Sequence, residues 1–383
     1  MKNLWFITRS WFPTQSGGVI VRSDQVKLFS KYFQVHVITP QYSKTLYSNN
    51  EIPTFYIPVF KDGSILRRGM MTLERVGLVE DYLDDWVYRA YLKIAKQINK
   101  DDLIFVTTGG EIASLKLGVR LKKATGSKLI LNYHDPIDYT KVNGYIIEND
   151  KKHVLRDKIE FKYLKDVDVV FTSSYTQLNS IRLKYASLNF HSECAYFGFP
   201  EPMNLIEKEN NDDQICIFYA GVITKAQAIE NICEAVKDKP IKLVVAGDYS
   251  GYPQLHSYIG KKNITFLGRI DRSIVHQKII DADIGYLSLS DPGYGACIPS
   301  KLYEYLNAGI PMLGGLPEGD ARDLINKNEW GIAVENSVPE LKDALSFLNR
   351  QNIKKWKNNV MSDRLNWSME KTYSHVIKIL TDL

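Results

Sequence analysis

Short apolar runs alternate with longer segments of helical periodicity along the first half of the chain. The apolar runs predict strands at residues 4–8, 34–39, 103–106, 128–133 and 169–172. Helical periodicity lies between several of these runs, at residues 23–32, 83–98, 113–125 and 174–185. This alternation is typical of βαβ units. Because residues 167–171 are almost continuously apolar, they favour a parallel sheet that is covered on both faces.

The same alternation restarts after an interruption in the middle of the chain. Residues 197–202 and the polar run 207–214 predict an interdomain linker. Strands are then expected at residues 215–220, 241–246, 264–267, 284–287 and 310–314, and helices at 226–237, 274–281 and 301–307. The expected fold class is α/β, with two tandem Rossmann-like doubly wound domains at residues 1–200 and 201–366. A last helical pattern, at residues 367–383, could pack on either domain.

Length and charge narrow the class of protein without identifying it. The 383 residues suffice for two cores, and the 44% of hydrophobic residues argues against disorder. Forty-nine basic against 44 acidic residues leave a net charge of +5, which is weak for a nucleic-acid-binding protein. The four cysteines form no CxxC pair, which favours reduced thiols in the cytoplasm over disulfides or zinc. No apolar stretch approaches 18 residues, so no membrane-spanning helix is expected.

The position of ligands follows from the expected topology. In open α/β sheets, ligands bind outside the carboxyl ends of the strands. We therefore expect the two domains to face a shared cleft and to hold one substrate each.

Two glycines, Gly17 and Gly18, follow the first predicted strand. They let the backbone approach a ligand closely, and the start of the next helix offers unpaired amides to an anion. A plain glycine turn is the alternative interpretation. The pattern is neither GxGxxG nor a P-loop, which disfavours dinucleotide-dependent redox enzymes and P-loop ATPases.

His134 and Asp135 directly follow the predicted strand at 128–133, and Pro136 ends it. A histidine at the carboxyl end of a strand can hydrogen-bond a sugar hydroxyl or transfer a proton. The alternative is a loop histidine that caps the next segment, but the position favours a functional role.

Gly221 and Lys225 occupy the first turn between a strand and a helix in the second domain. Gly221 allows close approach of the backbone, and Lys225 can place a cation beside a diphosphate near the start of the helix. A lone lysine is more often simply solvated.

The most specific pattern lies at residues 291–311, where a glycine-rich loop enters a short helix through Pro299 and Ser300. Lys301 lies in the first helical turn, and Glu304 lies one turn further along. The amides at the helix start can hold a diphosphate, and the Glu304 carboxylate can accept hydrogen bonds from a ribose diol.

With Pro-Ser-Lys-x-x-Glu-Tyr-x-x-Ala-Gly-x-Pro at 299–311, the chain resembles the GT-B fold glycosyltransferases of retaining family four. The resemblance is to the branch that builds bacterial surface polysaccharides such as O-antigen or capsule. Further similarity lies at the glycine pair, at 221–227, at 266–269 and at 282–284, so the resemblance covers nearly the whole chain.

The resemblance implies a transfer of a sugar from a nucleotide-sugar, with uridine as the expected base, to a lipid-linked or saccharide acceptor. The first domain would bind the acceptor, and the helix at 367–383 would cross back to it. His134 and Asp135 would be catalytic, near the transferred sugar. The implied donor-binding residues are Gly17, Gly18, Gly221, Lys225, Gln227, Gly268, Arg269, Ile298, Ser300, Lys301 and Glu304. Cofactors and metal ions are not expected, and Asp81, Asp84 and Asp85 are expected on a helix surface.

Two departures from the family pattern keep other functions open. The family's sugar-side glutamate is replaced by Ala296, unless the stretch 291–295 supplies a substitute, and an arginine expected after Gly221 is Val222. The alternatives are a sugar-nucleotide epimerase or hydrolase of the same fold and a non-catalytic nucleotide-binding scaffold subunit.

The segment 61–71 mixes arginine with apolar side chains. It could lie on the inner face of the cell membrane through Arg67 and Arg68 and bring a lipid-linked acceptor to the enzyme. The alternative is a loop whose apolar residues pack on the domain.

Overall fold

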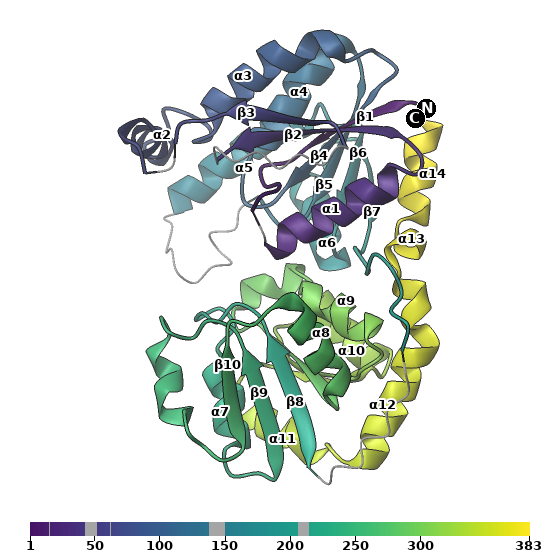
Figure 1. Ribbon diagram of the computed structural model, residues 1–383. Helices are drawn as coiled ribbons and strands as arrows, with labels where there is room; N and C mark the ends of the chain where they lie inside the picture. The colour runs from purple at the N-terminus through teal and green to yellow at the C-terminus, as the bar shows by residue number, and fades with distance from the viewer. Residues whose placement is uncertain (15, 43–51, 62, 138–149, 206–213) are drawn as a thin grey trace. The chain divides into compact units, whose positions relative to one another are not determined.

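The computed structural model describes residues 1–14, 16–42, 52–61, 63–137, 150–205 and 214–383. The polar run predicted as a linker lies almost entirely outside these residues. The chain divides into two units (Figure 1). The first contains the described residues of 1–197 together with Tyr373–Leu383, and the second contains those of Gly198–Thr372.

The first unit is built on a parallel sheet of seven strands in the order β3-β2-β1-β4-β5-β6-β7. The strands are β1 (Asn3–Ile7), β2 (Gln34–Gln41), β3 (Thr54–Pro58), β4 (Leu103–Thr108), β5 (Lys128–Tyr133), β6 (Val169–Thr172) and β7 (His191–Cys194). The five strands predicted from apolar runs are confirmed. The edge strands β3 and β7 were not predicted, because edge strands are less buried and therefore less apolar: β7 has the sequence His-Ser-Glu-Cys.

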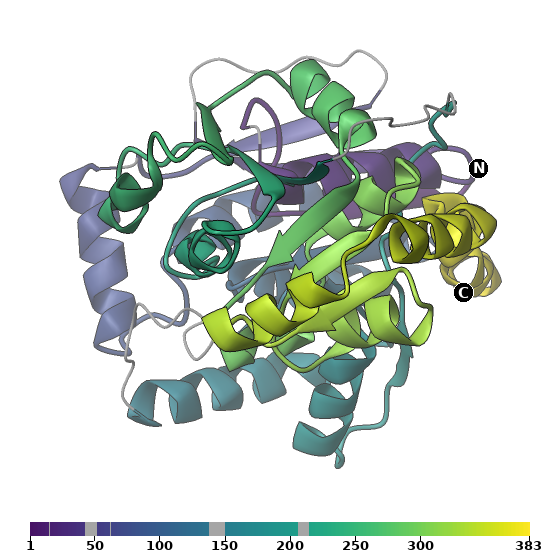
Figure 2. The same cartoon turned by 90° about the horizontal axis from the view of Figure 1, so that it is seen from below.

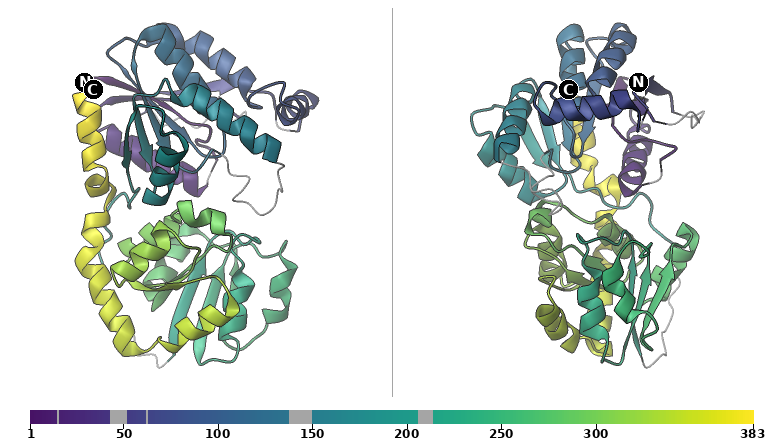
Figure 3. Two further views of the ribbon diagram at one scale, coloured as in Figure 1. Left: turned by 180° about the vertical axis from the view of Figure 1, so that it is seen from behind. Right: turned by 90° about the vertical axis from the view of Figure 1, so that its left-hand side faces the viewer.

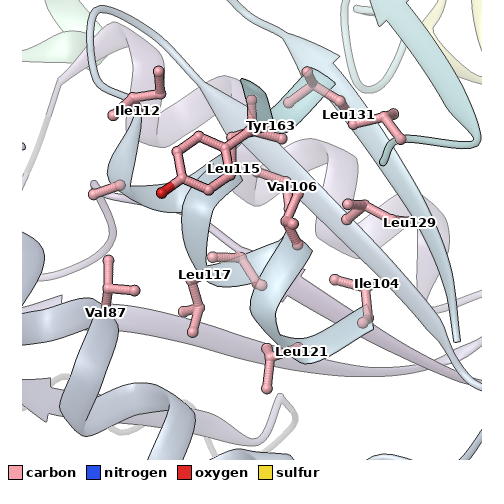
Figure 4. Close-up of a cluster of buried hydrophobic side chains, with 14 of the residues drawn as sticks. Val87, Ile104, Val106, Ile112, Leu115, Leu117, Leu121, Leu129, Leu131 and Tyr163 are labelled. Carbon is pink, nitrogen blue, oxygen red and sulfur yellow. The ribbon is translucent and has the colours of Figure 1, made fainter. Parts of the chain in front are cut away.

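Helices cover both faces of this sheet, as Figure 3 shows from two sides. The helices of this unit are α1 (Gly17–Phe29), α2 (Ile65–Arg75), α3 (Asp84–Ile94), η1 (Ala95–Gln97), α4 (Ala113–Thr125), α5 (Asp150–Leu164), α6 (Tyr175–Lys184) and α14 (Ser374–Asp382), of which α2 projects away from the sheet. Figure 4 shows Leu117 and Leu121 of α4 in one apolar cluster with Ile104 and Val106 of β4. Continuous burial of strands on two faces accounts for their apolar sequences.

The last helical pattern is broken into three pieces: η4 (Arg364–Trp367), α13 (Met369–Thr372) and α14. The break occurs where the backbone of Phe199 pairs with residues 367–369: Met369 N–H donates to Phe199 O at 2.7 Å. Gly198 has a φ of +69°, and a Cβ there would lie 2.4 Å from Trp367 O, so only glycine fits. Beyond the break, α14 packs on the first unit, where the Tyr373 hydroxyl accepts a 2.6 Å hydrogen bond from Gln25.

The second unit contains a parallel six-stranded sheet in the order β10-β9-β8-β11-β12-β13 (Figures 1 and 2). Its strands are β8 (Ile215–Ala220), β9 (Ile241–Ala246), β10 (Ile264–Gly268), β11 (Ile284–Ser288), β12 (Met312–Gly315) and β13 (Gly331–Val334). Its helices are α7 (Ile229–Val236), η2 (Pro253–Tyr258), α8 (Arg272–Asp281), η3 (Pro292–Ala296), α9 (Ser300–Asn307), α10 (Asp320–Lys327), α11 (Val338–Ser346) and α12 (Arg350–Asp363). The strand order reverses between β8 and β11, as it does between β1 and β4 in the first unit. Ligands of doubly wound sheets bind at such a reversal.

Candidate functional site

The predicted donor-binding residues of the second unit all follow the carboxyl ends of strands in one sheet. Gly221, Lys225 and Gln227 follow β8, while Arg269 follows β10 and Gly268 ends it. The residues from Ile298 to Glu304 follow β11. Because the sheet is parallel, these loops lie at the same edge, so the topology brings the predicted residues together.

Three of these loops touch through their backbones. Gly221 N–H donates to Ala246 O at 3.0 Å, and Gly247 N–H donates to Gly268 O at 2.8 Å. A Cβ at Gly247 would lie 2.3 Å from Gly221 O, so the close approach of the loops after β8 and β9 depends on glycine. The result is a backbone surface that a planar ligand can approach without meeting side chains from these glycines.

Lys301 and Glu304 form an ion pair across the first turn of α9. The Lys301 Nζ to Glu304 Oε2 distance is 2.7 Å, and both side chains are 26% exposed. No side chain caps the start of α9 at Pro299, so its first amides are available to an anion. A diphosphate can therefore bind to Lys301 and to these amides. The Glu304 carboxylate can then accept hydrogen bonds from a diol.

The helix that follows β8 begins later than predicted. Helix α7 begins at Ile229 rather than Ala226, because Ala228 has a left-handed backbone with φ of +43°. Lys225 is exposed in the preceding turn, so its placement at a helix N-terminus is wrong. The turn is held against β11 by Ser290, whose N–H donates to Ala226 O at 2.8 Å and whose hydroxyl donates to Lys225 O at 3.0 Å. The Gln227 side chain accepts a 2.6 Å hydrogen bond from Thr224.

The structure shows what surrounds Val222 and Ala296, the two positions that depart from the family pattern. Val222 is exposed beside Gly221. Asp291 cannot simply replace the carboxylate missing at Ala296, because its side chain accepts from Gly293 N–H at 2.8 Å and so caps η3. The backbone of Glu318 lies against Gly295, where a Cβ would be 2.1 Å from Glu318 O. Glu318 is exposed there, and the sequence pattern did not single it out.

In the first unit, helix α1 begins at Gly17, six residues earlier than predicted. The Ser16 hydroxyl accepts from Val19 N–H at 3.3 Å and thus caps the helix, as serine commonly does. Gly17 and Gly18 are therefore the first helical residues instead of a turn before the helix. Their amides belong to the first turn, whose N–H groups have no partner within a helix.

His134 and Asp135 follow β5 as predicted. The His134 ring lies on Phe197 with centroids 4.3 Å apart, and its side chain is 10% exposed. Nδ1 is 3.7 Å from Asp135 Oδ2, and Nε2 is buried without a hydrogen-bond partner among the described residues. Burial lowers the pKa of His134, helped by the charge of Arg22, so the imidazole is neutral near pH 7. Its Nε2 can form one hydrogen bond with a ligand.

A set of charged residues beside His134 was missed by the sequence analysis. Arg9 follows β1, Arg22 lies in the second turn of α1, and Glu111 precedes α4. Arg9 Nε is 3.4 Å from Glu111 Oε2, and its Nη2 donates to Gly109 O at 3.1 Å. In the sequence, each of these three residues is a single charged residue close to apolar ones. Charged residues on the surface show the same pattern, so the sequence could not distinguish them.

Two expectations for charged side chains are wrong. Arg67 is buried, with its guanidinium 4.2 Å from the centre of the Tyr82 ring and its Nη1 donating to Tyr82 O at 3.1 Å. It therefore anchors α2 to the unit and cannot contact a membrane, whereas Arg68 is exposed. Asp81 is also buried, because its carboxylate accepts the amides of Leu83, Ile112 and Ala113. It ties the starts of α3 and α4 together.

Two searches of the described residues bear on metals and membranes. No group of three or more histidine, cysteine, aspartate and glutamate side chains in them is placed to hold a metal ion. Within the same residues, every helix is too short or too polar to cross a membrane.

The family model of glycosyl transferases group 1 matches residues 204–360. This region is similar to group 1 glycosyltransferases. It contains all of the predicted donor residues of the second unit, from Gly221 to Glu304. A comparison with curated proteins finds no match.

Solved structures similar to the chain extend over both units. Anabaena Alr3699/HepE in complex with UDP-glucose is 12% identical, with a TM-score of 0.69 over 100% of both chains. Sucrose-phosphate synthase of Thermosynechococcus elongatus is 14% identical, with a TM-score of 0.70 over 100% of this chain and 99% of the other. A glycosyltransferase of Rickettsia africae ESF-5 is 13% identical, with a TM-score of 0.67 over 100% and 98%. The two parallel-sheet domains thus have the GT-B fold, as predicted.

Proposed function

We propose that the protein is a glycosyltransferase that moves a sugar from a UDP-sugar to a lipid-linked or saccharide acceptor, with retention, in the synthesis of a bacterial surface polysaccharide. The observation that carries the proposal is the Lys301–Glu304 pair in the first turn of α9, inside the region similar to group 1 glycosyltransferases. The similar HepE structure, which holds UDP-glucose, supports the choice of nucleotide. The resemblance of residues 299–311 to family four supports retention and the surface-polysaccharide role.

The second unit would bind the donor through groups of different chemistry. Glu304 would accept the ribose hydroxyls, and Lys301 with the amides near Ser300 would neutralise the diphosphate as it leaves. Lys225 would approach the same diphosphate from the loop after β8, and Gly268 would meet the base. Because lysine and amide groups can supply this stabilisation, we propose that the reaction needs no metal ion; undiminished turnover in excess EDTA is the expected result.

The first unit would bind the acceptor and orient the transferred sugar. His134 offers Nε2 to a sugar hydroxyl, and Asp135 lies beside it. A small hollow of about 20 Å³ lies beyond the ends of β1 and β2 and is too small as it stands to hold a sugar. It is lined by Trp11, Phe12, Pro13, Thr14, Pro40, Gln41, Tyr42 and Tyr56.

Helix α2 supports a contact with the membrane, through residues other than Arg67. Its apolar side chains are exposed, with Ile65 at 87% and Leu78, just beyond the helix, at 74%. Arg68 and Arg75 are exposed on the same short helix. An exposed amphipathic helix with arginine is suited to an anionic lipid surface, which would place the enzyme at the cytoplasmic face of the membrane, near a lipid-linked acceptor.

Reversing the charge of Arg68 and Arg75 together to glutamate should reduce binding to phosphatidylcholine vesicles that contain phosphatidylglycerol. We expect a loss of at least about 30-fold in partitioning, since each arginine contributes about 1 kcal/mol at such a surface and the glutamates add repulsion. Co-sedimentation measures the bound fraction. The matched control reverses Lys261 and Lys262, which are exposed in the second unit. Equal loss in both variants, or none in either, would show that α2 is not the contact.

A thermal-shift screen of UDP, GDP, ADP and CMP tests the proposed donor. UDP should raise the melting temperature most, because a ligand that binds only the folded state stabilises it. Absence of any shift with all four nucleotides would refute the assignment. Release of UDP from a UDP-sugar without an acceptor would instead favour a hydrolase, and binding without any turnover would favour a scaffold subunit.

A further inference from the structure

Asn336 is a buried asparagine at the edge of the second sheet where the strands end. It lies two residues beyond β13, and only 8% of its surface is exposed. Its side-chain Nδ2 donates to Gln227 O at 3.2 Å and to Ser288 Oγ at 3.0 Å. The Ser288 hydroxyl donates in turn to Gln227 O. One side chain thus connects the turn after β8 with the ends of β11 and β13.

Two neighbours set the place and the orientation of the Asn336 amide. Strand β12 lies between β11 and β13 and ends at Gly315, where a Cβ would be 3.1 Å from Asn336 Oδ1 and 2.6 Å from the Tyr286 hydroxyl. The absence of a side chain there leaves the space that Asn336 occupies. Asn231, in the first turn of α7, donates its side-chain amide to Asn336 Oδ1 at 3.2 Å and to Asn336 O at 2.9 Å. Because Oδ1 accepts a hydrogen bond, Nδ2 is the atom that faces Gln227.

The turn that Asn336 contacts has an unfavourable backbone conformation. Ala228, directly after Gln227, has a φ of +43°, which residues other than glycine rarely adopt. Such a conformation persists only where surrounding contacts hold it, and it occurs often at functional sites. The two preceding carbonyls, of residues 225 and 226, accept hydrogen bonds from Ser290. With Asn336 at Gln227, three successive carbonyls of the turn are held by residues at the ends of β11 and β13.

We propose that Asn336 is a positioning residue for the donor: it holds the turn at residues 224–228 so that Lys225 meets the diphosphate. This inference rests on the proposed function, which assigns Lys225 to that diphosphate. A lysine side chain is long and flexible, so a fixed backbone narrows the positions that its ammonium group can take. Lys225 is exposed, and its carbonyl is the first of the three that are held. Asn336 acts through Gln227 and not by touching the donor.

The first test replaces Asn336 by alanine and measures the affinity for UDP by calorimetry. We expect a loss of about 3- to 10-fold, the effect of removing a neutral hydrogen bond. The affinity for uridine, which has no diphosphate, should change less than about twofold. Asn336→Asp keeps the size of the side chain but places an acceptor against Gln227 O, so it should weaken UDP binding at least as much as alanine.

Asn263→Ala is the matched control in the same unit. The Asn263 side chain donates to the carbonyls of Val236, Lys239 and Ile241 at 2.7, 3.2 and 3.1 Å, so it too connects separate segments of the chain. These carbonyls lie near the start of β9, at the edge of the sheet opposite the candidate site. Asn263→Ala should therefore lower the melting temperature and leave the UDP affinity unchanged.

A double-mutant cycle with Lys225→Met separates positioning from a general loss of structure. Lys225→Met should weaken UDP binding about 10- to 100-fold, since a charge-assisted contact with the diphosphate is lost. In that background, Asn336→Ala should cost less than about a further twofold, because a residue that acts through Lys225 has nothing left to position. An asparagine with a merely structural role would give the same loss whether or not Lys225 is present.

The inference is overturned, with UDP still the donor nucleotide, by any of four results. They are native UDP affinity in Asn336→Ala, native UDP affinity in Lys225→Met, equal losses of UDP and uridine binding, and additive losses in the cycle. Should Asn336→Ala fail to fold, Asn231→Ala removes only the donor that orients the Asn336 amide, and the same comparisons apply to it. Failure of the native protein to bind UDP contradicts the proposed function itself, and this inference with it.

Discussion

Replacement of Glu304 by alanine is expected to weaken UDP binding about 10- to 100-fold, the effect of losing a hydrogen-bonded carboxylate. The ribose diol would lose its acceptor, and Lys301 would keep its charge for the diphosphate. The fold should survive, because the Lys301–Glu304 pair is partly exposed and joins residues three apart on one helix. Such pairs contribute less than about 1 kcal/mol to stability. Isothermal titration calorimetry measures the affinity, and thermal unfolding measures the stability.

The isosteric variant Glu304→Gln sharpens this experiment. It keeps the size of the side chain but removes the charge, so its loss should be smaller than that of alanine. Glu329→Gln is the matched control, because Glu329 pairs with Lys355 at 2.8 Å in the same unit and lies outside the candidate site. UDP affinity in Glu304→Ala equal to that of the native protein would exclude Glu304 from the ribose site.

Replacement of His134 by alanine should lower kcat about 100-fold with little change in the KM for the donor, as for removal of one preorganised hydrogen-bonding group. Nε2 is buried and unpaired among the described residues, so a hydroxyl that reached it would satisfy a hydrogen bond that the described residues leave unmade. Steady-state kinetics with a UDP-sugar provides the measurement. His191→Ala is the control, because His191 is an exposed histidine on edge strand β7. A fall in kcat below twofold would exclude His134 from the reaction.

The same histidine should leave a signature in the pH dependence of stability. Burial lowers the pKa of His134 below its ordinary 6.5 in the folded protein. The unfolded chain therefore binds more protons as the pH falls through about 6.5, and the free energy of unfolding should fall in that range. Denaturant unfolding at several pH values measures the slope. His134→Gln should have a smaller slope than the native protein, and an unchanged slope would contradict the burial of a neutral imidazole.

Most of the fold was predictable because parallel strands covered on both faces are apolar throughout. This property is local and is visible in runs such as Ile215–Ala220 and Lys128–Tyr133. The edge strands β3, β7 and β13 were missed: β7 is polar, with the sequence His-Ser-Glu-Cys, whereas β13 is apolar but only four residues long. The helix start at Gly17 depended on one side-chain cap, which lies beyond the range of a periodicity argument.

The candidate donor residues were predictable to a similar degree, since the loop and helix at 291–311 form one continuous pattern. The sequence pattern did not show which partners the charged side chains have. The sequence contains Lys301 and Glu304 three residues apart, and the structure shows them paired. It contains Asp291 in the loop, and the structure shows that this carboxylate caps η3.

The amino-acid sequence by itself determined two parallel α/β sheets and the strand ends at which the candidate site residues lie, because apolar runs are local properties. Only the tertiary structure decided which charges are buried. Arg67 and Arg68 are neighbours in the chain, yet one stacks on Tyr82 and the other faces solvent, since successive helical residues point about 100° apart. Likewise, Arg22 of α1 is buried where its Nε donates to Thr107 near the end of β4. Burial depends on what the rest of the chain places against a side chain, and that is not encoded in its immediate neighbours.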